Sequence, residues 1–591
     1  MVTSLCALLL AATLTADSGV SVSSSSAWVD ETLHRMTLRE KAAQMVMPWL
    51  PGGRPRRNSA EWRRARELVL EEKVGGFSVG KGPARETAGW LNDLQKLSDV
   101  PLLVSADLEW GPGTRLEGAT VLPVNMAIAA AGDPILAYEA GRLTAIEARA
   151  AGIHLAFAPV ADVNINADNP VINTRAYGAD PVLVAERVTS FIRGAQEGGL
   201  LTAAKHFPGH GDTEIDSHLA LPVIHASRKR LERVELVPFR AAIGADVAAI
   251  MTAHLAVPAL EPDGAERPAT LSRPIVTGLL REELGFDGLI VTDGLMMDGI
   301  RAGRTVGEVA VEAVKAGADI LLMPPSTREA IDALVAAVEA GEIDEDRLDA
   351  SVRRILDAKA RVGLERRRTV DLRALPRVLG TSEHERWAQD VAERSLTLVR
   401  DDAGGIPLRL SGKRVLSITY TDSRRGTGGE RFDEELKKAG ARVTSLRLWR
   451  QSSAEQIERV RRAAANADVV IFSSYARALP WKGTLGLPRP IGELANRLAA
   501  NGAIVISFGD PYLVRQLWAS ETYLLAWSEA EVAQRAAARA LIGETRIAGR
   551  LPIPLPPFHM LGDGLTAPRE PIFDTGIGEI DAGAARGASE Q

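Results

Sequence analysis

The sequence predicts an α/β protein with two domains: an N-terminal (β/α)8 TIM-like barrel followed by a C-terminal α/β sandwich domain. Three observations support this. The chain has 591 residues, more than one ordinary hydrophobic core accommodates. Eight short apolar runs alternate with amphipathic stretches, and the same alternation then restarts in the last third of the chain. An open doubly wound sheet remains the alternative for the first part, because alternation alone does not show that a sheet closes.

The eight apolar runs of the first part have the length and composition of buried strands. They are residues 43–49, 74–79, 101–107, 154–163, 201–207, 247–255, 288–293 and 318–324. Asp133 and Asp180 are each followed by Pro, so we expect them to cap the helices that start there. Eight strand–helix units within residues 28–365 favour a barrel.

A basic, helix-like linker over residues 366–394 precedes six further strand-like runs. These are residues 396–399, 414–422, 441–448, 468–476, 503–510 and 522–528. Helix-like stretches separate them, so we expect an open α/β sandwich over residues 395–560. No glycine-rich nucleotide-binding pattern follows any of these strands. Residues 561–591 are rich in Gly, Ala and Pro and are interpreted as a tail.

Residues 1–27 are similar to a signal peptide or leader, with the apolar run LCALLLAATL followed by a Ser-rich stretch. We expect export to the periplasm or the medium, with a cytoplasmic location as the alternative because no Lys or Arg precedes the apolar run. No later stretch is apolar enough to span a membrane. The net charge of −6 gives no electrostatic reason to expect nucleic acid as a partner. The oligomeric state is not indicated.

The segment KHFPGHGDTEIDSH, residues 205–218, is the richest in reactive side chains. Three of the nine histidines of the protein lie in it, His206, His210 and His218, together with Lys205 and Asp216. It follows an apolar run and contains several turn-forming residues. We therefore expect a loop at the C-terminal end of a buried strand, where barrel enzymes place their active sites.

This segment supports two kinds of chemistry. Its His and Asp side chains are ligands for Zn²⁺ or Fe²⁺, although they crowd one loop, whereas barrel metal sites usually collect ligands from several strands. In the second interpretation, Asp216 hydrogen-bonds to His218 two residues later and orients its ring. His218 then serves as an acid and a base near neutral pH. The second interpretation requires no metal and no cofactor.

Other polar residues end predicted strands and would project into the same cleft. The complete set is Asp107, Glu109, Asp162, Asn164, Lys205, His206, His254, Asp293 and Asp298. Among these carboxylates, Asp293 is the strongest candidate for a catalytic residue, because the run GLIVT precedes it and Gly294 follows. A carboxylate fixed at the end of so apolar a strand suits a nucleophile or a base, although a strand-end Asp also commonly caps the next helix.

Together these segments resemble family 3 glycoside hydrolases, in the β-N-acetylglucosaminidase branch. KHFPGHGDTEIDSH is similar to the signature K-H-F-P-G-H-G-x-x-x-x-D-S-H, and FDGLIVTDGLMMDGI to the nucleophile segment. ADNPVINTRAYG is similar to the sugar-binding Arg loop, and ADLEWGPGTRL to the Asp-to-Arg loop. The resemblance covers about residues 28–365, and the ending ALIGETRIAGRLPIPLP is similar to the close of the family's second domain.

The resemblance implies a catalytic nucleophile, Asp293, and a general acid/base, His218, with Asp216 as its partner. It also implies a set of residues that bind the hydroxyl groups of a terminal N-acetylglucosamine: Asp107, Arg115, Arg175, Lys205 and His206. The expected activity is that of a retaining exo-β-N-acetylglucosaminidase (β-N-acetylhexosaminidase). It would hydrolyse cell-wall (peptidoglycan) or chitin fragments through a covalent glycosyl-Asp intermediate.

Four alternatives stay open. A neutral imidazole does not repel an anion, so phosphate could replace water and make the protein a β-N-acetylglucosaminide phosphorylase. A β-glucosidase or β-xylosidase of the same family is disfavoured by the pair Asp216 and His218. A barrel metallohydrolase is the third alternative, and a non-catalytic sugar-binding protein is the fourth. Two departures from the family pattern, Trp110 in the Asp-to-Arg loop and Gly294 after Asp293, concern the geometry of the subsites.

Overall fold

The computed structural model describes residues 18–569, apart from 302, 403, 427, 479–481, 483 and 484, and it describes no side chain before residue 26. The chain forms two compact units. The first consists of Met1–Thr120, Tyr138–Asp162 and Val188–Thr381, and the second of Val121–Ala137, Val163–Arg187 and Ser382–Gln591. The first 17 residues of the predicted leader lie outside the described part of the chain.

Parallel strands of the first unit close into a barrel. Seven of them form one sheet in the order β10–β9–β8–β7–β5–β3–β2, and β1 pairs with β11. Two links complete the ring. A parallel bridge from Val291 to Ile320 connects β10 to the strand that contains β11, and only Pro48 separates β1 from β2. The predicted barrel is thereby confirmed, and the alternative of an open sheet is wrong for this part of the chain.

The barrel strands overlap the eight predicted apolar runs. Their bounds are β1 (Val46–Met47), β2 (Trp49–Leu50), β3 (Gly76–Val79), β5 (Leu103–Ala106), β7 (Leu155–Ala156), β8 (Leu201–Phe207), β9 (Ala249–Thr252), β10 (Leu289–Thr292) and β11 (Leu321–Leu322). Two short strands outside the ring, β4 (Gly82–Pro83) and β6 (Leu116–Glu117), pair with each other.

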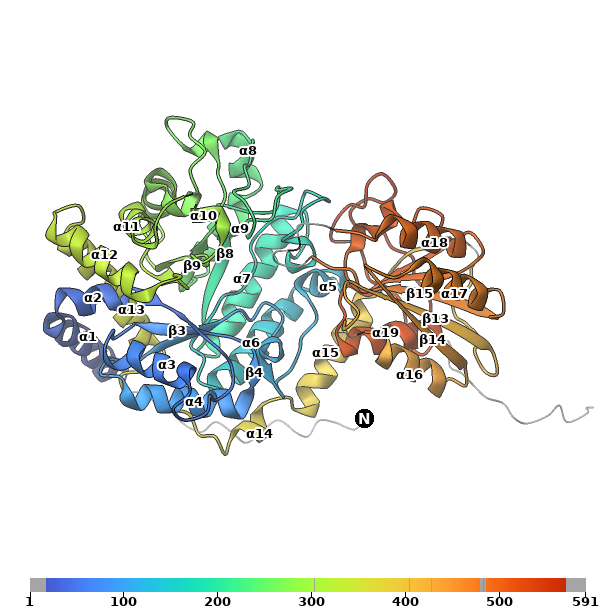
Figure 1. Ribbon diagram of the computed structural model, residues 1–591, viewed down its shortest axis with the longest axis horizontal. Helices are drawn as coiled ribbons and strands as arrows, with labels where there is room; N and C mark the ends of the chain where they lie inside the picture. Colours follow the sequence, from blue (N-terminus) through green and yellow to red (C-terminus); the bar gives the residue numbers. More distant parts are fainter. Residues whose placement is uncertain are drawn as a thin grey trace, which may run out of the picture. The chain divides into compact units, whose positions relative to one another are not determined.

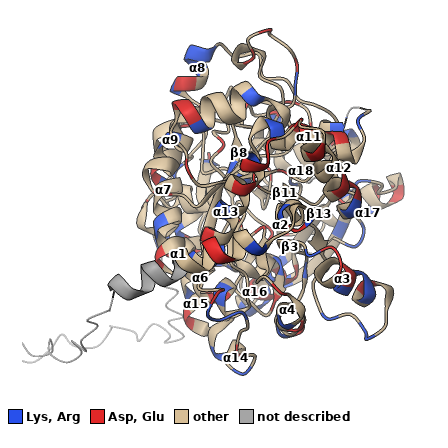
Figure 2. Cartoon of the chain, turned by 90° about the vertical axis from the view of Figure 1, so that its left-hand side faces the viewer, with Lys and Arg blue, Asp and Glu red and all other residues tan. Residues whose placement is uncertain are grey.

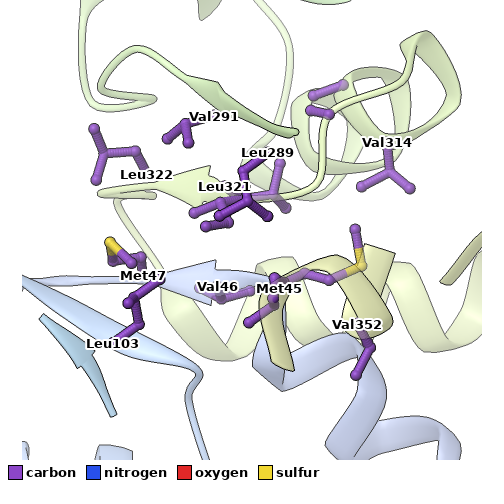
Figure 3. Packing of buried hydrophobic residues seen from close by; sticks show 14 of the residues in the cluster. Met45, Val46, Met47, Leu103, Leu289, Val291, Val314, Leu321, Leu322 and Val352 are labelled. Carbon is purple, nitrogen blue, oxygen red and sulfur yellow. The ribbon is translucent and has the colours of Figure 1, made fainter. Parts of the chain in front are cut away.

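The strands are mostly apolar because almost all of their residues are buried. In Figure 3, Val46, Leu103, Val291 and Leu321 of the barrel belong to the same hydrophobic cluster as Val352 of a covering helix. A parallel sheet with helices on its outside has no solvent-facing side, so its strands do not alternate between polar and apolar residues. This explains why continuous apolar runs in the sequence predicted the strands.

Helices surround the barrel strands (Figure 1). They are α1 (Ser18–Arg35), α2 (Leu38–Gln44), α3 (Ala60–Leu70), α4 (Ala84–Leu97), α6 (Ile135–Ala150), α7 (Pro181–Glu197), α8 (Arg228–Arg233), α9 (Leu236–Gly244), α10 (Asp298–Arg301), α11 (Val306–Ala316), α12 (Thr327–Glu339), α13 (Glu345–Arg361) and α14 (Leu375–Val378), with a π-helix at Pro274–Glu283. Asp180 Oδ1 accepts hydrogen bonds from the N–H groups of Val182 and Leu183, each at 2.9 Å, and Asp133 Oδ1 accepts one from Ile135 at 3.1 Å. Both predicted caps are confirmed.

The second unit is an α/β sandwich on a six-stranded sheet of order β12–β17–β16–β15–β13–β14, in which only β12 runs antiparallel to its neighbour. The strands are β12 (Thr397–Asp401), β13 (Arg414–Thr421), β14 (Arg442–Trp449), β15 (Val469–Ser474), β16 (Ile504–Ser507) and β17 (Thr522–Leu525). All six lie at predicted runs. Helices α17 (Ala454–Ala464) and α18 (Arg489–Ala499) cover one face, and α15 (Ser382–Ser395), α16 (Glu430–Lys438) and α19 (Glu531–Leu541) cover the other (Figure 1).

Two segments that follow barrel strands in the sequence pack within the second unit. Val121–Ala137 contains α5 (Asn125–Ala130), which packs against α15, and Val163–Arg187 contains a short 3-10 helix, Asn173–Arg175. The sequence pattern had placed both segments in the barrel domain. Of the predicted tail, residues up to 569 are described, and the Leu565 N–H donates to the Leu398 carbonyl at 2.7 Å.

No helix in residues 18–569, as far as they are described, is long and apolar enough to cross a membrane. In Figure 2, basic and acidic residues both occur along helices such as α3 and α8.

Candidate active site

Lys205, at the end of β8, is the centre of a charged cluster at the C-terminal rim of the barrel. Its side chain is 2% exposed, and its Nζ lies 2.9 Å from Asp107 Oδ1 and 2.8 Å from Glu109 Oε1. Arg115 Nη2 reaches the other oxygen of Asp107 at 3.0 Å. Burial raises the pKa of Asp107, but the two cations outweigh it and hold this pKa below its ordinary value. Two cations and two carboxylates are thus fixed against one another before any ligand binds.

His206 is oriented by a carboxylate from the neighbouring strand. Its Nδ1 lies 2.7 Å from Asp162 Oδ2. The other oxygen of Asp162 accepts hydrogen bonds from the backbone N–H groups of His206 at 3.1 Å and His210 at 2.7 Å. Asp162 is fully buried. One carboxylate therefore sets both the ring of His206 and the path of the loop that begins after it.

Asp293 directly follows β10, as the sequence pattern predicts. Its Oδ1 accepts a hydrogen bond from the Gly294 N–H at 2.7 Å. Burial raises the pKa of this carboxyl group, but His206, His254, the Gly294 N–H and His218 lower it, and the resulting pKa is about 2. A carboxyl group with this pKa is ionised at neutral pH, as an attacking group must be.

His254 braces the peptide that follows Asp293. This buried ring at the end of the β9 segment has Nε2 3.2 Å from the Gly294 carbonyl and Nδ1 2.9 Å from Thr270 Oγ1. Burial lowers the pKa of His254, which favours its neutral form. The contact fixes the backbone on one side of the carboxylate, while the Gly294 N–H fixes the carboxylate itself.

Asp216 and His218 form the predicted pair. His218 Nδ1 lies 2.7 Å from Asp216 Oδ1, which also accepts the His218 N–H at 2.9 Å. The side chain of Asp216 is fully buried, whereas that of His218 is 15% exposed. The carboxylate orients the ring and engages Nδ1, so Nε2 is the ring nitrogen on the other side of this contact.

The loop between these groups is stabilised by its own side chains and by the Asp293 segment. His210 is buried, with Nδ1 2.9 Å from Thr213 Oγ1 and Nε2 2.9 Å from Ser217 Oγ, so it links residues within the loop. A Cβ atom at Gly299, in α10, would lie 2.5 Å from the Ser217 carbonyl oxygen. The acid/base loop therefore rests directly on the segment that follows Asp293.

The three histidines of the motif do not converge on one point where a metal ion would bind. His206 is engaged by Asp162, His210 by Thr213 and Ser217, and His218 by Asp216. Within the described residues, no group of three or more His, Cys, Asp or Glu side chains has an arrangement that could hold a metal ion.

Of the predicted site residues, seven belong to the barrel unit: Asp107, Arg115, Lys205, His206, Asp216, His218 and Asp293. Arg175 belongs to the second unit, where its Nη1 donates to the Val171 carbonyl at 3.0 Å and Asn125 Nδ2 donates to the Arg175 carbonyl at 2.7 Å. Asp298 starts α10 and pairs with Arg301 at 2.8 Å, so it is not part of the charged cluster. Trp110 is half-buried in the loop after β5.

Three contributors were recognised in the sequence only as strand ends, without a role: Glu109, Asp162 and His254. Each acts through a partner far away in the sequence, namely Lys205, His206 and the Gly294 carbonyl. Their position at the C-terminal ends of strands indicated that they could lie in the site. No local sequence pattern predicts which residues they contact.

Comparisons with known proteins identify the family. The profile of the glycosyl hydrolase family 3 N-terminal domain matches residues 37–358. A β-N-acetylglucosaminidase/β-glucosidase from Cellulomonas fimi is 31% identical over 506 residues, which are 81% of this chain and 88% of that protein. The chain belongs to glycosyl hydrolase family 3.

Further relatives agree with this assignment. A β-hexosaminidase A from Pseudoalteromonas piscicida is 35% identical over 391 residues, which are 61% of this chain and 64% of that protein. The solved structure of a family 3 β-N-acetylglucosaminidase from Paenibacillus sp. str. FPU-7 is 37% identical, with a TM-score of 0.79 and coverage of 88% of this chain and 99% of that one. A β-glucoside phosphorylase structure is 26% identical, with a TM-score of 0.80 and coverage of 90% of this chain and 96% of that one.

Proposed function

We propose that this family 3 glycoside hydrolase removes terminal N-acetylglucosamine from β-glycosides with retention of configuration. The observation that carries the proposal is the combination of an ionised carboxylate, Asp293, with the oriented pair Asp216 and His218 in one barrel unit. The Paenibacillus β-N-acetylglucosaminidase and the Pseudoalteromonas piscicida β-hexosaminidase A support the choice of sugar, whereas the Cellulomonas fimi relative carries the names of both a β-N-acetylglucosaminidase and a β-glucosidase.

In the first step, Asp293 attacks the anomeric carbon while His218 protonates the leaving glycosidic oxygen. The bond between sugar and aglycone breaks, and a covalent glycosyl-Asp intermediate forms. In the second step, His218 removes a proton from water, the water oxygen attacks the anomeric carbon, and the Asp293 carboxylate is released. Assistance of this kind by a positioned acid/base group is worth about 10²–10⁴ in rate.

The charged cluster suits the hydroxyl groups of the terminal sugar. Lys205, Arg115 and His206 offer donors, and Asp107 offers acceptors, all held in place by ion pairs of about 3 Å. Fixing a polyhydroxylated ring by such charge-assisted hydrogen bonds places its anomeric carbon for attack without ordering these side chains anew. In this proposal Arg175 supplies a further cation for the same ring.

The natural substrates proposed are fragments of peptidoglycan or chitin that end in N-acetylglucosamine. The leader-like residues 1–27 support export, which would expose the enzyme to such polymers. Fractionation of cells that express the full chain, with N-terminal sequencing of the mature protein, tests the location. Full-length protein found only in the cytoplasm would contradict export.

The decisive experiment compares an aryl β-N-acetylglucosaminide with the matching aryl β-glucoside for the wild type, Asp293→Ala and His218→Ala. We expect a clear preference for the first substrate and loss of activity in both variants. Proton NMR of the first-formed sugar should show the β-anomer. A fully active Asp293→Ala enzyme, or an α-anomer as the first product, would contradict the proposed mechanism.

Phosphorolysis is the second candidate. A neutral imidazole as the acid/base does not repel an incoming anion, and the similar β-glucoside phosphorylase keeps this alternative in view. The same assay with and without inorganic phosphate separates the two reactions, because phosphorolysis yields a sugar 1-phosphate. Treatment with a chelator, which should leave the activity unchanged, tests the metallohydrolase alternative.

A further inference from the structure

The segment that carries Arg175 is held by buried hydrogen bonds to two residues that follow strand β16 of the sandwich. Asn173 Nδ2 donates to Asp510 Oδ1 at 3.0 Å, and Asn164 Nδ2 donates to the Tyr512 hydroxyl at 2.9 Å. Asn164 Oδ1 accepts the backbone N–H of Asn173 at 3.1 Å. None of these four side chains belongs to a residue more than 5% exposed. Together they form one connected network, in which Asn164 and Asn173 belong to the Arg175 segment and Asp510 and Tyr512 follow strand β16.

The Asp510 side chain is oriented by a hydrogen bond to its own local backbone as well as by the Arg175 segment. It lies just beyond β16, and its Oδ1 also accepts the Tyr512 N–H at 3.1 Å, which caps the 3-10 helix Pro511–Arg515. Burial raises the pKa of Asp510. A buried acceptor of this kind is costly to leave unsatisfied, so the hydrogen bond from Asn173 is strongly favoured.

Asn173 adopts a backbone conformation that needs such support. Its φ is +44°, in the left-handed region that side chains other than Gly rarely occupy, although Asn tolerates it best. Its Oδ1 accepts the Thr174 N–H at 2.8 Å while its Nδ2 reaches Asp510. Arg175 follows two residues later in the same short helix. The conformation at Asn173 therefore directs the chain that carries the Arg175 guanidinium.

Two outer contacts hold the segment more loosely. Arg515 pairs with Asp168 at 2.8 Å, but both side chains are exposed, and such pairs contribute little free energy. The Ala179 N–H donates to the Pro552 carbonyl at 2.9 Å, beyond the short helix. The Asp510 side chain, by contrast, is buried and hydrogen-bonds to the helix Asn173–Arg175 itself.

We propose that Asp510 is a positioning residue for substrate binding. Through Asn173 it fixes the segment that carries Arg175, the residue proposed to bind the terminal sugar. This inference rests on the proposed function, in which Arg175 binds N-acetylglucosamine. Loss of the contact should raise KM and leave kcat nearly unchanged, because the attacking and proton-transferring groups lie in the barrel unit.

The test measures kcat and KM for an aryl β-N-acetylglucosaminide with the full chain. In Asp510→Ala, loss of a buried hydrogen bond to a charged group should raise KM about ten- to a hundredfold. Asp510→Asn keeps an acceptor oxygen in the same place and should stay within about threefold of the wild type. Asp433→Ala removes another buried carboxyl group of the same sandwich, one that contacts Ser445, and should leave KM unchanged.

A double-mutant cycle with Arg175→Ala distinguishes positioning from a general loss of structure. If Asp510 acts through Arg175, Asp510→Ala should add nothing to the increase in KM that Arg175→Ala already causes. The same fold-increase in both backgrounds would overturn the inference, as would an unchanged KM in folded Asp510→Ala. If Arg175→Ala itself leaves KM unchanged, the proposed role of Arg175 in sugar binding fails, and the inference fails with it.

A second variant covers the case in which Asp510→Ala does not fold. Asn173→Asp places a carboxylate against Asp510 and should raise KM, and adding Asp510→Asn should restore it because the amide can donate to the new carboxylate. Failure of this rescue in a folded double variant would also overturn the inference.

Discussion

Replacing Gly299 by Ala tests whether the acid/base loop is positioned by backbone contact with the segment after Asp293. The new Cβ would lie 2.5 Å from the Ser217 carbonyl oxygen and 2.9 Å from that of Ala220. Ordinary separations are about 3.5 Å, so the loop must retreat by roughly 1 Å. Backbone oxygens cannot rotate away as a side chain would, and Ser217 directly precedes His218.

The expected cost is about 1–3 kcal/mol in the free energy of unfolding, as for other overpacked sites. A displacement of about 1 Å in a catalytic group typically lowers the rate about a hundredfold. In the proposed mechanism His218 is the acid of the first step, so kcat/KM should fall most for substrates with a poor leaving group and least for a dinitrophenyl glycoside, which needs no protonation.

Gly244→Ala serves as the matched control, because no atom lies within 4 Å of the added Cβ and the residue is also in a barrel-unit helix. It should keep the wild-type kcat/KM for every leaving group. If Gly299→Ala lowers kcat/KM equally for good and poor leaving groups, or not at all, the loop is not positioned through this contact.

Four further results are expected. Asp216→Asn should lower kcat by about 10²–10⁴ and change the pH profile, and an unaltered profile would separate Asp216 from the proton transfer. Lys205→Met removes the cation that pairs with both Asp107 and Glu109 and leaves Arg115 beside Asp107, so urea unfolding should show a loss of about 3 kcal/mol; a loss below about 1 kcal/mol would mean that solvent screens this cluster. The pKa of Asp293 is about 2, below the ordinary 3.8. Its ionisation therefore contributes stability that is present above about pH 4 and lost as the pH falls towards 2. His254→Phe removes one group that lowers this pKa, so the acid limb of kcat/KM should move to higher pH, and an unmoved limb would contradict this assignment.

The barrel was predictable because its strands are buried on both faces. The uncharged runs 201–204 and 288–292 lead directly into Lys205–His206 and Asp293. In a parallel barrel, the C-terminal ends of all strands lie on the same rim, so these residues could be placed there without knowledge of tertiary contacts. The pair Asp216 and His218 was equally accessible, because its hydrogen bond joins residues two apart.

Contacts between distant segments were not predictable in this way. Glu109 pairs with Lys205 and Asp162 with His206 across large stretches of sequence, and neither has a local pattern that names its partner. The assignment of residues 163–187 to the second unit has the same cause. This segment is held by a hydrogen bond to Asp510, more than 300 residues later. In the sequence, Asp510 is recognisable only as an acidic residue after a predicted strand.

The discontinuous make-up of the second unit also affects the order in which the protein becomes complete during synthesis. Residues 163–187 leave the ribosome early, but their partners in the sandwich begin only at Ser382. At about 5–20 residues per second, roughly 10–40 s separate the two. The barrel strands are all synthesised before Arg175 acquires its support. We therefore expect a nascent chain that already has a folded barrel to gain its affinity for sugar last, and a chain that stops at the end of the barrel to lack it.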